Sequence, residues 1–184
     1  MFFFRGWEER YFSGMKIQVA GLSEGGHQYH FDVQASEIGL GEEFSDVHVD
    51  VQLDKTPNQI ALNVAVHTAA GFLCDRCTAP FVSPVDAAYR MHYIWNNEDA
   101  GQYDVAEVQV IPQGSTIIDI TEDVRQTVLV AVPLKLLCRE DCRGLCPHCG
   151  KDLNEGPCNC KPVEIDSRWE KLRALKDTKS QDPR

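Results

Sequence analysis

Eight cysteines in a chain of 184 residues restrict what this chain can fold into more than any other feature. Two pairs, Cys74–Cys77 and Cys146–Cys149, have a C-x-x-C spacing, which lets one tight turn aim both sulfurs at the same ion. The remaining four are Cys138, Cys142, Cys158 and Cys160. Six of the eight therefore fall within the 23 residues 138–160, and such crowding predicts metal ligation rather than isolated buried thiols.

Eight thiolates are enough for two tetrahedral Cys₄ zinc sites, and we expect one or two Zn²⁺ per chain. Such a closed site is structural, because it leaves no coordination position for water or substrate. In one partition, the first ion is bound by Cys74, Cys77, Cys138 and Cys142. The second ion is then bound by Cys146, Cys149, Cys158 and Cys160. Pairing the two C-x-x-C turns on one ion is also compatible with the spacing. An iron–sulfur cluster and a redox pair at Cys74–Cys77 are the alternatives to zinc.

The N-terminal sequence MFFFRGWEER bears on the redox state of these thiols. A secreted disulfide framework needs a signal peptide with an apolar stretch of about 7–15 residues, and only three phenylalanines precede Arg5. We therefore expect a cytoplasmic protein with reduced cysteines. Residues 1–14 are expected to form an N-terminal extension, with Met15 as an alternative start. The sequence has no apolar run of the ~20 residues that a membrane-spanning helix needs.

Alternation of apolar and polar residues predicts strands along the first half of the chain. The clearest case is residues 44–54, in which valine and leucine alternate with histidine, aspartate and glutamine. The other expected strands are Lys16–Ala20, Tyr29–Val33, Ile60–Val66, Val85–Trp95 and Val105–Ile111. Because short turns join successive strands, we expect an antiparallel sheet over residues 16–95.

Two helices are expected beyond the strands. The first follows Thr116–Ile120, with Thr121 as its N-cap and Pro133 after its end. Its apolar face would consist of Val124, Val128 and Val132. A strand is the alternative for this stretch, because many of its residues are β-branched. The second would begin at Asp166 and present Trp169, Leu172 and Leu175. The expected fold class is α+β, with a mostly antiparallel β-sheet, a few helices and a C-terminal Cys-rich zinc-binding segment. The expected units are a β-rich domain over 15–115 and a second unit over 116–184.

Charge is distributed unevenly along the chain. Residues 1–134 contain 7 Lys and Arg against 19 Asp and Glu, whereas residues 135–184 contain 11 against 9, so the two parts carry −12 and +2. A net charge of −10 repels phosphate, so contact with nucleic acid requires a local basic patch. Candidates close to the cysteines are Lys135, Arg139, Arg143, Lys151 and Lys161. The alternative is that these side chains are simply solvated.

Two motifs of common enzyme sites are absent from the sequence, which has no G-x-x-x-x-G-K-[ST] and no H-E-x-x-H. The run Gly21–Gly25 has the spacing G-x-S-x-G, but it falls in a glycine-rich turn between two expected strands and not at the strand-to-helix turn of a nucleophilic serine. His27 and His30 have no acidic partner at a motif spacing, so we expect them to be surface histidines. His148 lies between two cysteines and is expected to point to solvent. No nucleophile with a base is indicated, and we expect a protein that is not an enzyme.

The run CREDCRGLCPHCGKDLN over residues 138–154, closed by Cys158-Asn-Cys160, resembles the YceD-like family. These are bacterial and plastid proteins associated with accumulation of large-subunit (23S) ribosomal RNA. The resemblance covers about Met15 to Leu175. It includes Gly21-Leu22-Ser23, Tyr29-x-Phe31, Cys74-x-Arg76-Cys77 and the stretch from Ile118 to Pro133. Asp166-Ser167-Arg168 stands where many members have Asp-Pro-Arg.

The resemblance implies a non-catalytic factor that supports ribosomal RNA stability or large-subunit assembly. Its partner would be ribosomal RNA or a large-subunit precursor. The placement of charge makes Arg139, Arg143 and Lys151 the candidate RNA contacts, and the acidic body could face a basic ribosomal protein. The alternatives are a thiol-based redox or metal-handling protein, and a protein–protein adaptor that binds a basic ribosomal protein without touching RNA. Neither a membrane nor a small-molecule substrate is expected as a partner.

Overall fold

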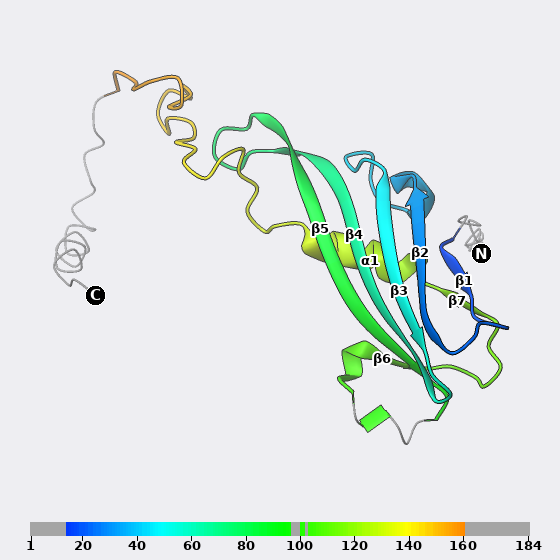
Figure 1. The fold of residues 1–184 in the computed structure, drawn as a ribbon. Helices are drawn as coiled ribbons and strands as arrows, with labels where there is room; N and C mark the ends of the chain where they lie inside the picture. Colours follow the sequence, from blue (N-terminus) through cyan, green and yellow to red (C-terminus); the bar gives the residue numbers. More distant parts are fainter. Residues whose placement is uncertain (1–13, 97–99, 102, 161–184) are drawn as a thin grey trace, which may run out of the picture.

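A five-stranded sheet forms the body of the protein (Figure 1). The computed structural model describes residues 14–96, 100–101 and 103–160. In spatial order the strands are β2 (Gly25–Val33), β3 (Val47–Lys55), β4 (Gln59–Leu73), β5 (Pro80–Ile94) and β6 (Val108–Val110). Strands β2 to β5 pair antiparallel, and the short β6 pairs parallel with β5. The mostly antiparallel sheet that the alternation predicted is therefore confirmed.

Strand β1 (Lys16–Gln18) does not belong to this sheet, so the expectation of one sheet over residues 16–95 is wrong at its start. It pairs instead with β7 (Ile117–Asp119) in a separate two-stranded sheet. Ile17 lies opposite Ile118, and both side chains are buried. Each strand contributes a single inward side chain to the core, so the sequence carries no periodic signal for this pairing.

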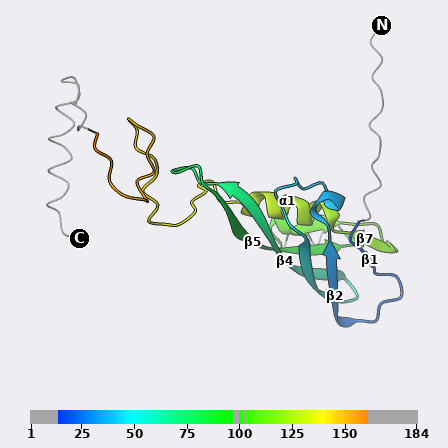
Figure 2. The same cartoon turned by 90° about the horizontal axis from the view of Figure 1, so that it is seen from above.

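Helix α1 (Thr121–Ala131) lies along one face of the large sheet (Figure 2). Val124 and Val128 are buried in the core, as predicted, whereas Val132 lies beyond the end of the helix and is half-buried. Thr121 is not the N-cap, because it is already the first helical residue. The Oδ1 atom of Asp119 accepts hydrogen bonds from the Thr121 backbone N–H at 3.0 Å and from its hydroxyl at 2.6 Å.

The larger hydrophobic core of the described residues lies between the sheet and the elements on its covered face. Alternate residues of β3 and β4 point into it, and Ile17, Ile118, Val124 and Val128 come from the other side. Residues on both sides of the expected domain boundary at 115/116 therefore share one core, and the division of the chain remains a prediction. The opposite face of the sheet is open to solvent.

Two 3₁₀ helices, Ala35–Ile38 and Val105–Glu107, complete the described elements. The second replaces the start of the strand expected over Val105–Ile111, because the Asp104 carboxylate accepts a hydrogen bond from the backbone N–H of Ala106 at 3.1 Å. The described residues contain one α-helix. The helix expected from Asp166 and the N-terminal extension up to residue 13 lie outside the described residues. No helix in the described part of the chain is long and apolar enough to cross a membrane.

Strands β4 and β5 reach beyond their neighbours and form a projecting hairpin, which we call the arm (residues 68–85). The pairing of β3 with β4 ends at His48 opposite His67, whereas β4 and β5 stay paired as far as Leu73 opposite Pro80. Residues 43–45 support the base of the arm, since Ser45 N–H donates to Ala69 O and Gly71 N–H donates to Glu43 O. The tip of the arm carries Cys74 and Cys77 toward the cysteine-rich part of the chain (Figure 1).

Candidate metal centres

The turn at the tip of the arm holds the first pair of cysteines. Cys74 N–H donates to Ala79 O at 3.0 Å, and Thr78 N–H donates to Cys74 O at 2.8 Å. Thr78 has a φ of 58°, a left-handed conformation that closes the turn. Both thiols are buried, with exposed fractions of 1% for Cys74 and 6% for Cys77. The hairpin therefore fixes two sulfurs side by side before any other part of the chain contributes.

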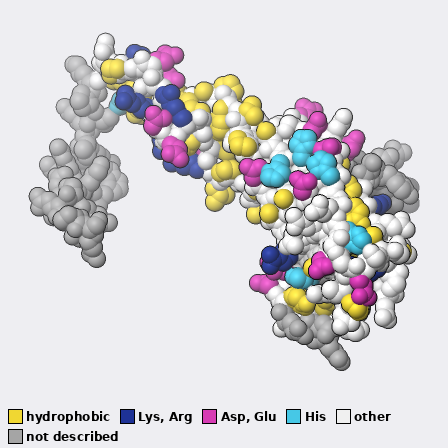
Figure 3. Space-filling view, in the orientation of Figure 1, with side chains coloured by type: hydrophobic (Ala, Val, Ile, Leu, Met, Phe, Trp, Pro, Cys, Tyr) yellow, Lys and Arg dark blue, Asp and Glu magenta, His cyan; other side chains and the backbone are white. Residues whose placement is uncertain are grey.

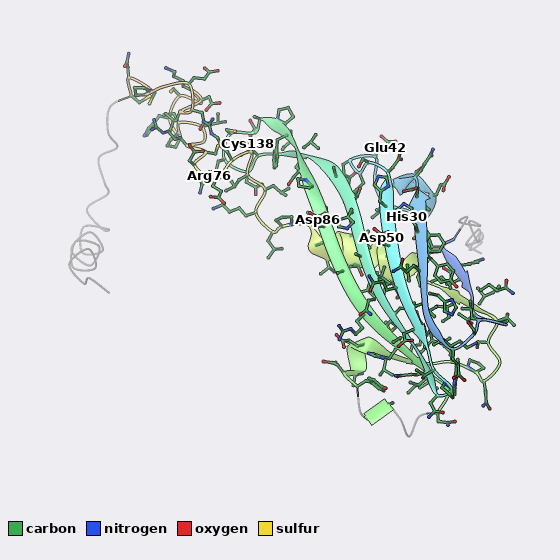
Figure 4. All side chains as sticks on the ribbon, viewed as in Figure 1. His30, Glu42, Asp50, Arg76, Asp86 and Cys138 are labelled. Atoms are coloured by element: carbon green, nitrogen blue, oxygen red, sulfur yellow. The ribbon has the colours of Figure 1, made fainter. Side chains whose placement is uncertain are left out.

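The segment that follows α1 docks against this turn and brings two more thiols (Figure 4). The backbone N–H of Asp75 donates to Leu136 O at 2.8 Å, and the Asp75 carboxylate accepts from the Leu136 N–H at 2.7 Å. The Arg76 guanidinium donates to the carbonyl of Cys142 at 2.6 Å and to that of Glu140 at 3.3 Å. Side chains on the turn thus hold the backbone that carries Cys138 and Cys142.

The resulting sulfur positions fit a tetrahedral ion. The Sγ atoms of Cys74 and Cys142 lie 3.8 Å apart, and those of Cys77 and Cys138 lie 3.7 Å apart. All four sulfurs are within 4.8 Å of one another. A Zn–S bond of about 2.3 Å requires sulfurs about 3.8 Å apart at the corners of a tetrahedron. This group can therefore accept a zinc-sized ion with little rearrangement.

The second group forms around another tight turn. Gly150 N–H donates to Cys146 O at 2.9 Å, Cys146 N–H donates to Lys151 O at 2.8 Å, and Gly150 has a φ of 72°. The Cys146 sulfur lies 3.4 Å from that of Cys158 and 4.0 Å from that of Cys160. With Cys149, which is exposed, these sulfurs all lie within 4.8 Å of one another. The second group is thus more open to solvent than the first.

Residues without thiols link the two groups. Leu145 N–H donates to Arg76 O at 3.0 Å, and Gly144 packs so closely there that a Cβ on it would lie 2.8 Å from the same oxygen. The Asn154 amide oxygen accepts from Arg143 N–H at 2.8 Å, and its NH₂ lies 3.5 Å from the Cys142 sulfur. A donor to a ligating sulfur orients it and stabilises the thiolate. The contacts of Arg76, Gly144 and Asn154 were not identified from the sequence, although all three fall within the motifs quoted above.

Hydrogen bonds to sulfur make one thiol of each group acidic. Backbone N–H groups, that of Cys138 foremost, lower the pKa of Cys74 to about 6. Backbone N–H groups of Cys149 and His148 lower the pKa of Cys146 to about 6. Burial raises the pKa of Cys138 to about 12. Each group therefore offers one readily formed thiolate as a first ligand, and an ion must displace protons from the others.

The structure places the eight predicted cysteines in two groups of four. The C-x-x-C pair Cys74–Cys77 belongs to one group and the pair Cys146–Cys149 to the other. His148 is exposed and belongs to neither group, as expected. Arg139, Arg143 and Lys151 are exposed on the same segment, where Lys and Arg side chains gather in the upper left of Figure 3. Arg139 lies 3.3 Å from the Asp141 carboxylate, and the Lys151 ammonium donates to Pro157 O at 3.1 Å. Lys161 lies outside the described residues.

The profile of the family described as large ribosomal RNA subunit accumulation protein YceD matches residues 62–176, more than half of the chain. This match begins in β4 and includes all eight cysteines. No solved structure matches the chain significantly.

Curated relatives come from bacteria and plants. An uncharacterized protein of Mycobacterium tuberculosis is 28% identical over 128 residues, which are 67% of this chain and 59% of that protein. A Mycobacterium bovis protein matches with the same values. The chain thus spans less than two thirds of these relatives. The Arabidopsis thaliana protein named large ribosomal RNA subunit accumulation protein YCED homolog 1, chloroplastic, is 31% identical over 35% of this chain and 20% of its own length. The Zea mays protein of the same name is 36% identical over 29% of this chain and 19% of its own length.

Proposed function

Because this chain belongs to the YceD family, we propose that it is a non-catalytic cytoplasmic factor that supports accumulation of 23S ribosomal RNA and assembly of the large ribosomal subunit. The observation that carries this proposal is the family match over residues 62–176, which spans the arm and both cysteine groups. The names of the plant relatives point to the same process. Members of the family are named as accumulation factors and not as enzymes.

We propose that both cysteine groups hold structural Zn²⁺. The support is the donor set of four sulfurs in each group and the sulfur separations of 3.7 and 3.8 Å in the first. Four thiolates complete a tetrahedral shell, so the ion would stabilise the fold and leave no position for substrate. Elemental analysis of the purified full chain should give two zinc per chain. Iron in place of zinc would identify an iron–sulfur protein instead.

We propose further that Arg139, Arg143 and Lys151 contact ribosomal RNA phosphates. These side chains are exposed on the cysteine segment, whereas residues 1–134 carry a net charge of −12. Arg143 makes no ion pair within the described residues, so its charge is available to a phosphate. Such contacts position an RNA without reading its sequence. The segment would therefore bind RNA while the acidic body points away from it or meets a basic ribosomal protein.

Depletion in cells followed by complementation tests this function directly. Loss of the protein should lower the ratio of 23S to 16S ribosomal RNA, and the parent chain should restore it. The triple substitution Arg139→Ala, Arg143→Ala and Lys151→Ala should restore it poorly. The matched control replaces three basic residues of the body, Lys16, Arg90 and Arg125, by alanine, and it should complement like the parent. An unchanged ratio after depletion would refute the ribosomal role.

Two outcomes would favour the alternatives. If the triple variant binds large-subunit precursor particles as well as the parent does, the contact is made by the acidic body, and the protein is an adaptor for a basic ribosomal protein. If a small number of thiols react with a thiol reagent in the absence of chelator, those thiols are reactive rather than ligating, and a redox role follows. Ligating thiols would be protected together and released together by a chelator.

A further inference from the structure

Histidine and aspartate alternate across the open face of the large sheet, away from both cysteine groups. The six residues are His30, Asp32, His48, Asp50, His67 and Asp86. Figure 3 shows them as a cluster of cyan and magenta side chains on the front of the sheet, and Figure 4 labels His30, Asp50 and Asp86. The register places His30 of β2 opposite Asp50 of β3, and Asp32 opposite His48. His67 of β4 lies opposite Asp86 of β5.

Two of the imidazoles converge on one carboxylate. Asp32 Oδ1 lies 2.5 Å from His48 Nδ1 and 3.2 Å from His30 Nε2. The three candidate ligand atoms of His30, Asp32 and His48 lie within 4.8 Å of one another. They belong to two adjacent strands whose backbones are hydrogen-bonded over nine residue pairs, so their positions are fixed by the ladder and not by a loop. This is a two-nitrogen, one-oxygen donor set held on rigid elements.

A second carboxylate supports one of these imidazoles. Asp50 Oδ1 lies 2.8 Å from His30 Nδ1, on the side of the ring away from Asp32. When His30 donates its Nδ1–H to Asp50, the lone pair of Nε2 points toward Asp32 and is free for a metal. Histidines that bind metals commonly donate their other N–H to a carboxylate, which fixes the tautomer and increases ligand basicity. His67, in contrast, has a single carboxylate partner among the described residues, Asp86, at 2.8 Å.

We propose that His30, Asp32 and His48 form a third metal site, which binds a divalent transition-metal ion such as Zn²⁺ or Ni²⁺. Imidazole and carboxylate ligands suit these ions, and the donor set differs from the all-sulfur groups at the tip of the arm. Three protein ligands leave a coordination position for water, unlike a closed Cys₄ site. The four side chains involved are 55–60% exposed, so the ion would exchange with solvent. This site is independent of the ribosomal role proposed above.

Calorimetric titration of Zn²⁺ into the full chain, after both cysteine groups have been saturated with zinc, tests the proposal. The parent should bind one further ion. His30→Ala and His48→Ala should each weaken this event at least tenfold, and Asp50→Asn should weaken it about tenfold by releasing the His30 ring. His67→Ala is the matched control, because it removes an exposed histidine of the same face that has only one carboxylate partner, and it should bind like the parent.

Cobalt gives a second readout that separates the sites. Co²⁺ added to the zinc-loaded protein should produce d–d bands without the thiolate charge-transfer bands of a sulfur site, and His48→Ala should abolish them. All substituted side chains are exposed, so the variants should keep the far-UV circular dichroism of the parent. Absence of a further binding event, or equal loss in His67→Ala and His48→Ala, would overturn the proposal.

Discussion

In the sheet body, alternate side chains of β3 are buried valines and leucine, whereas in residues 136–160 the buried side chains are mainly cysteines. The body has one continuous apolar core under helix α1. Where the cysteine segment meets the tip of the arm there is only a small cluster, in which Cys74, Cys77 and Cys142 are covered by Ala79, Phe81 and Leu137. The body therefore buries enough apolar surface to fold without an ion, whereas the folding of the segment depends on the metal ions that join its sulfurs.

Removal of metal should separate the two regions most strongly. A structural zinc can contribute on the order of 10 kcal/mol, so chelation should unfold residues 136–160 and leave the sheet intact. Hydrogen exchange measured peptide by peptide would show loss of protection confined to the segment and the tip of the arm. Loss of protection throughout the chain in a single transition would contradict this independence of the body.

A cavity in the core should destabilise the sheet body and leave the metal groups unchanged. Leu62→Ala removes a fully buried side chain of β4 and should lower the free energy of unfolding of the body by about 2–5 kcal/mol. Zinc content should stay at the parent value, because Leu62 is far along the strand from the arm tip. Val82→Ala, at an exposed position of β5, is the control and should change stability by less than about 0.5 kcal/mol. Urea unfolding followed by elemental analysis provides both measurements.

The difference in charge between the regions should appear in RNA binding. If Arg139, Arg143 and Lys151 each neutralise one phosphate, replacing all three by alanine should reduce the slope of log K against log salt by about 2–3. Filter binding to large-subunit precursor RNA over a range of salt concentrations measures it. Zinc content should not change, since none of the three is a ligand. A slope equal to that of the parent would show that these side chains do not contact phosphate.

The contact between the two cysteine groups can be weakened without touching a ligand. Gly144→Ala introduces a Cβ that would lie 2.8 Å from Arg76 O at a φ of 74°, and it should destabilise the segment by about 1–3 kcal/mol. Gly150 has nearly the same φ, 72°, but no atom near its missing Cβ, so Gly150→Ala carries the backbone cost alone. Faster transfer of zinc to a chromophoric chelator from Gly144→Ala than from Gly150→Ala would confirm the contact, and equal rates would argue against it.

The smallest effect concerns the protonation of His30 on the open face of the sheet. The hydrogen bond to Asp50, followed by the charge of Asp32, raises the pKa of His30, so protonation of His30 stabilises the folded chain. This contribution is complete below the pKa of an unfolded histidine and is lost as pH rises through the higher folded value. Asp50→Asn should lower the pKa of His30 in an NMR titration without added metal, and stability should then decline at a lower pH. An unchanged His30 pKa would show that the pair does not form in solution.

Much of the body could be predicted from the sequence because its signal is local. The alternation over 44–54 and 60–66 fixes which side chains of β3 and β4 are buried, and Val124 and Val128 mark the buried side of α1. The pairing of β1 with β7 could not be predicted, since the two strands lie about a hundred residues apart and each buries one side chain. The hydrogen bonds that Asp119 accepts from Thr121 were missed for a similar reason, because they depend on where β7 ends.

At the metal groups, spacing predicted ligation but left the partition open. The partition depends on the position of the arm, on the hydrogen bonds between Asp75 and Leu136 and on the hydrogen bond from Arg76 to Cys142 O. These hydrogen bonds join residues about sixty positions apart in the sequence. The histidine and aspartate cluster was missed because its partners lie on neighbouring strands. His30 and Asp50 are twenty residues apart in sequence, a separation that no local motif contains.

The arm also sets an order of events during synthesis of the chain. Cys77 leaves the ribosome 61 residues before Cys138, its neighbour in the first group, whereas Cys146 and Cys160 are only 14 residues apart. At about 5–20 residues per second, Cys77 waits roughly 3–12 s for Cys138 to emerge. The four thiols of the second group emerge within about 3 s of one another at the same rate. The nascent chain therefore passes through a stage in which the tip of the arm is a half-built site, open to any soft metal ion or thiol in its surroundings.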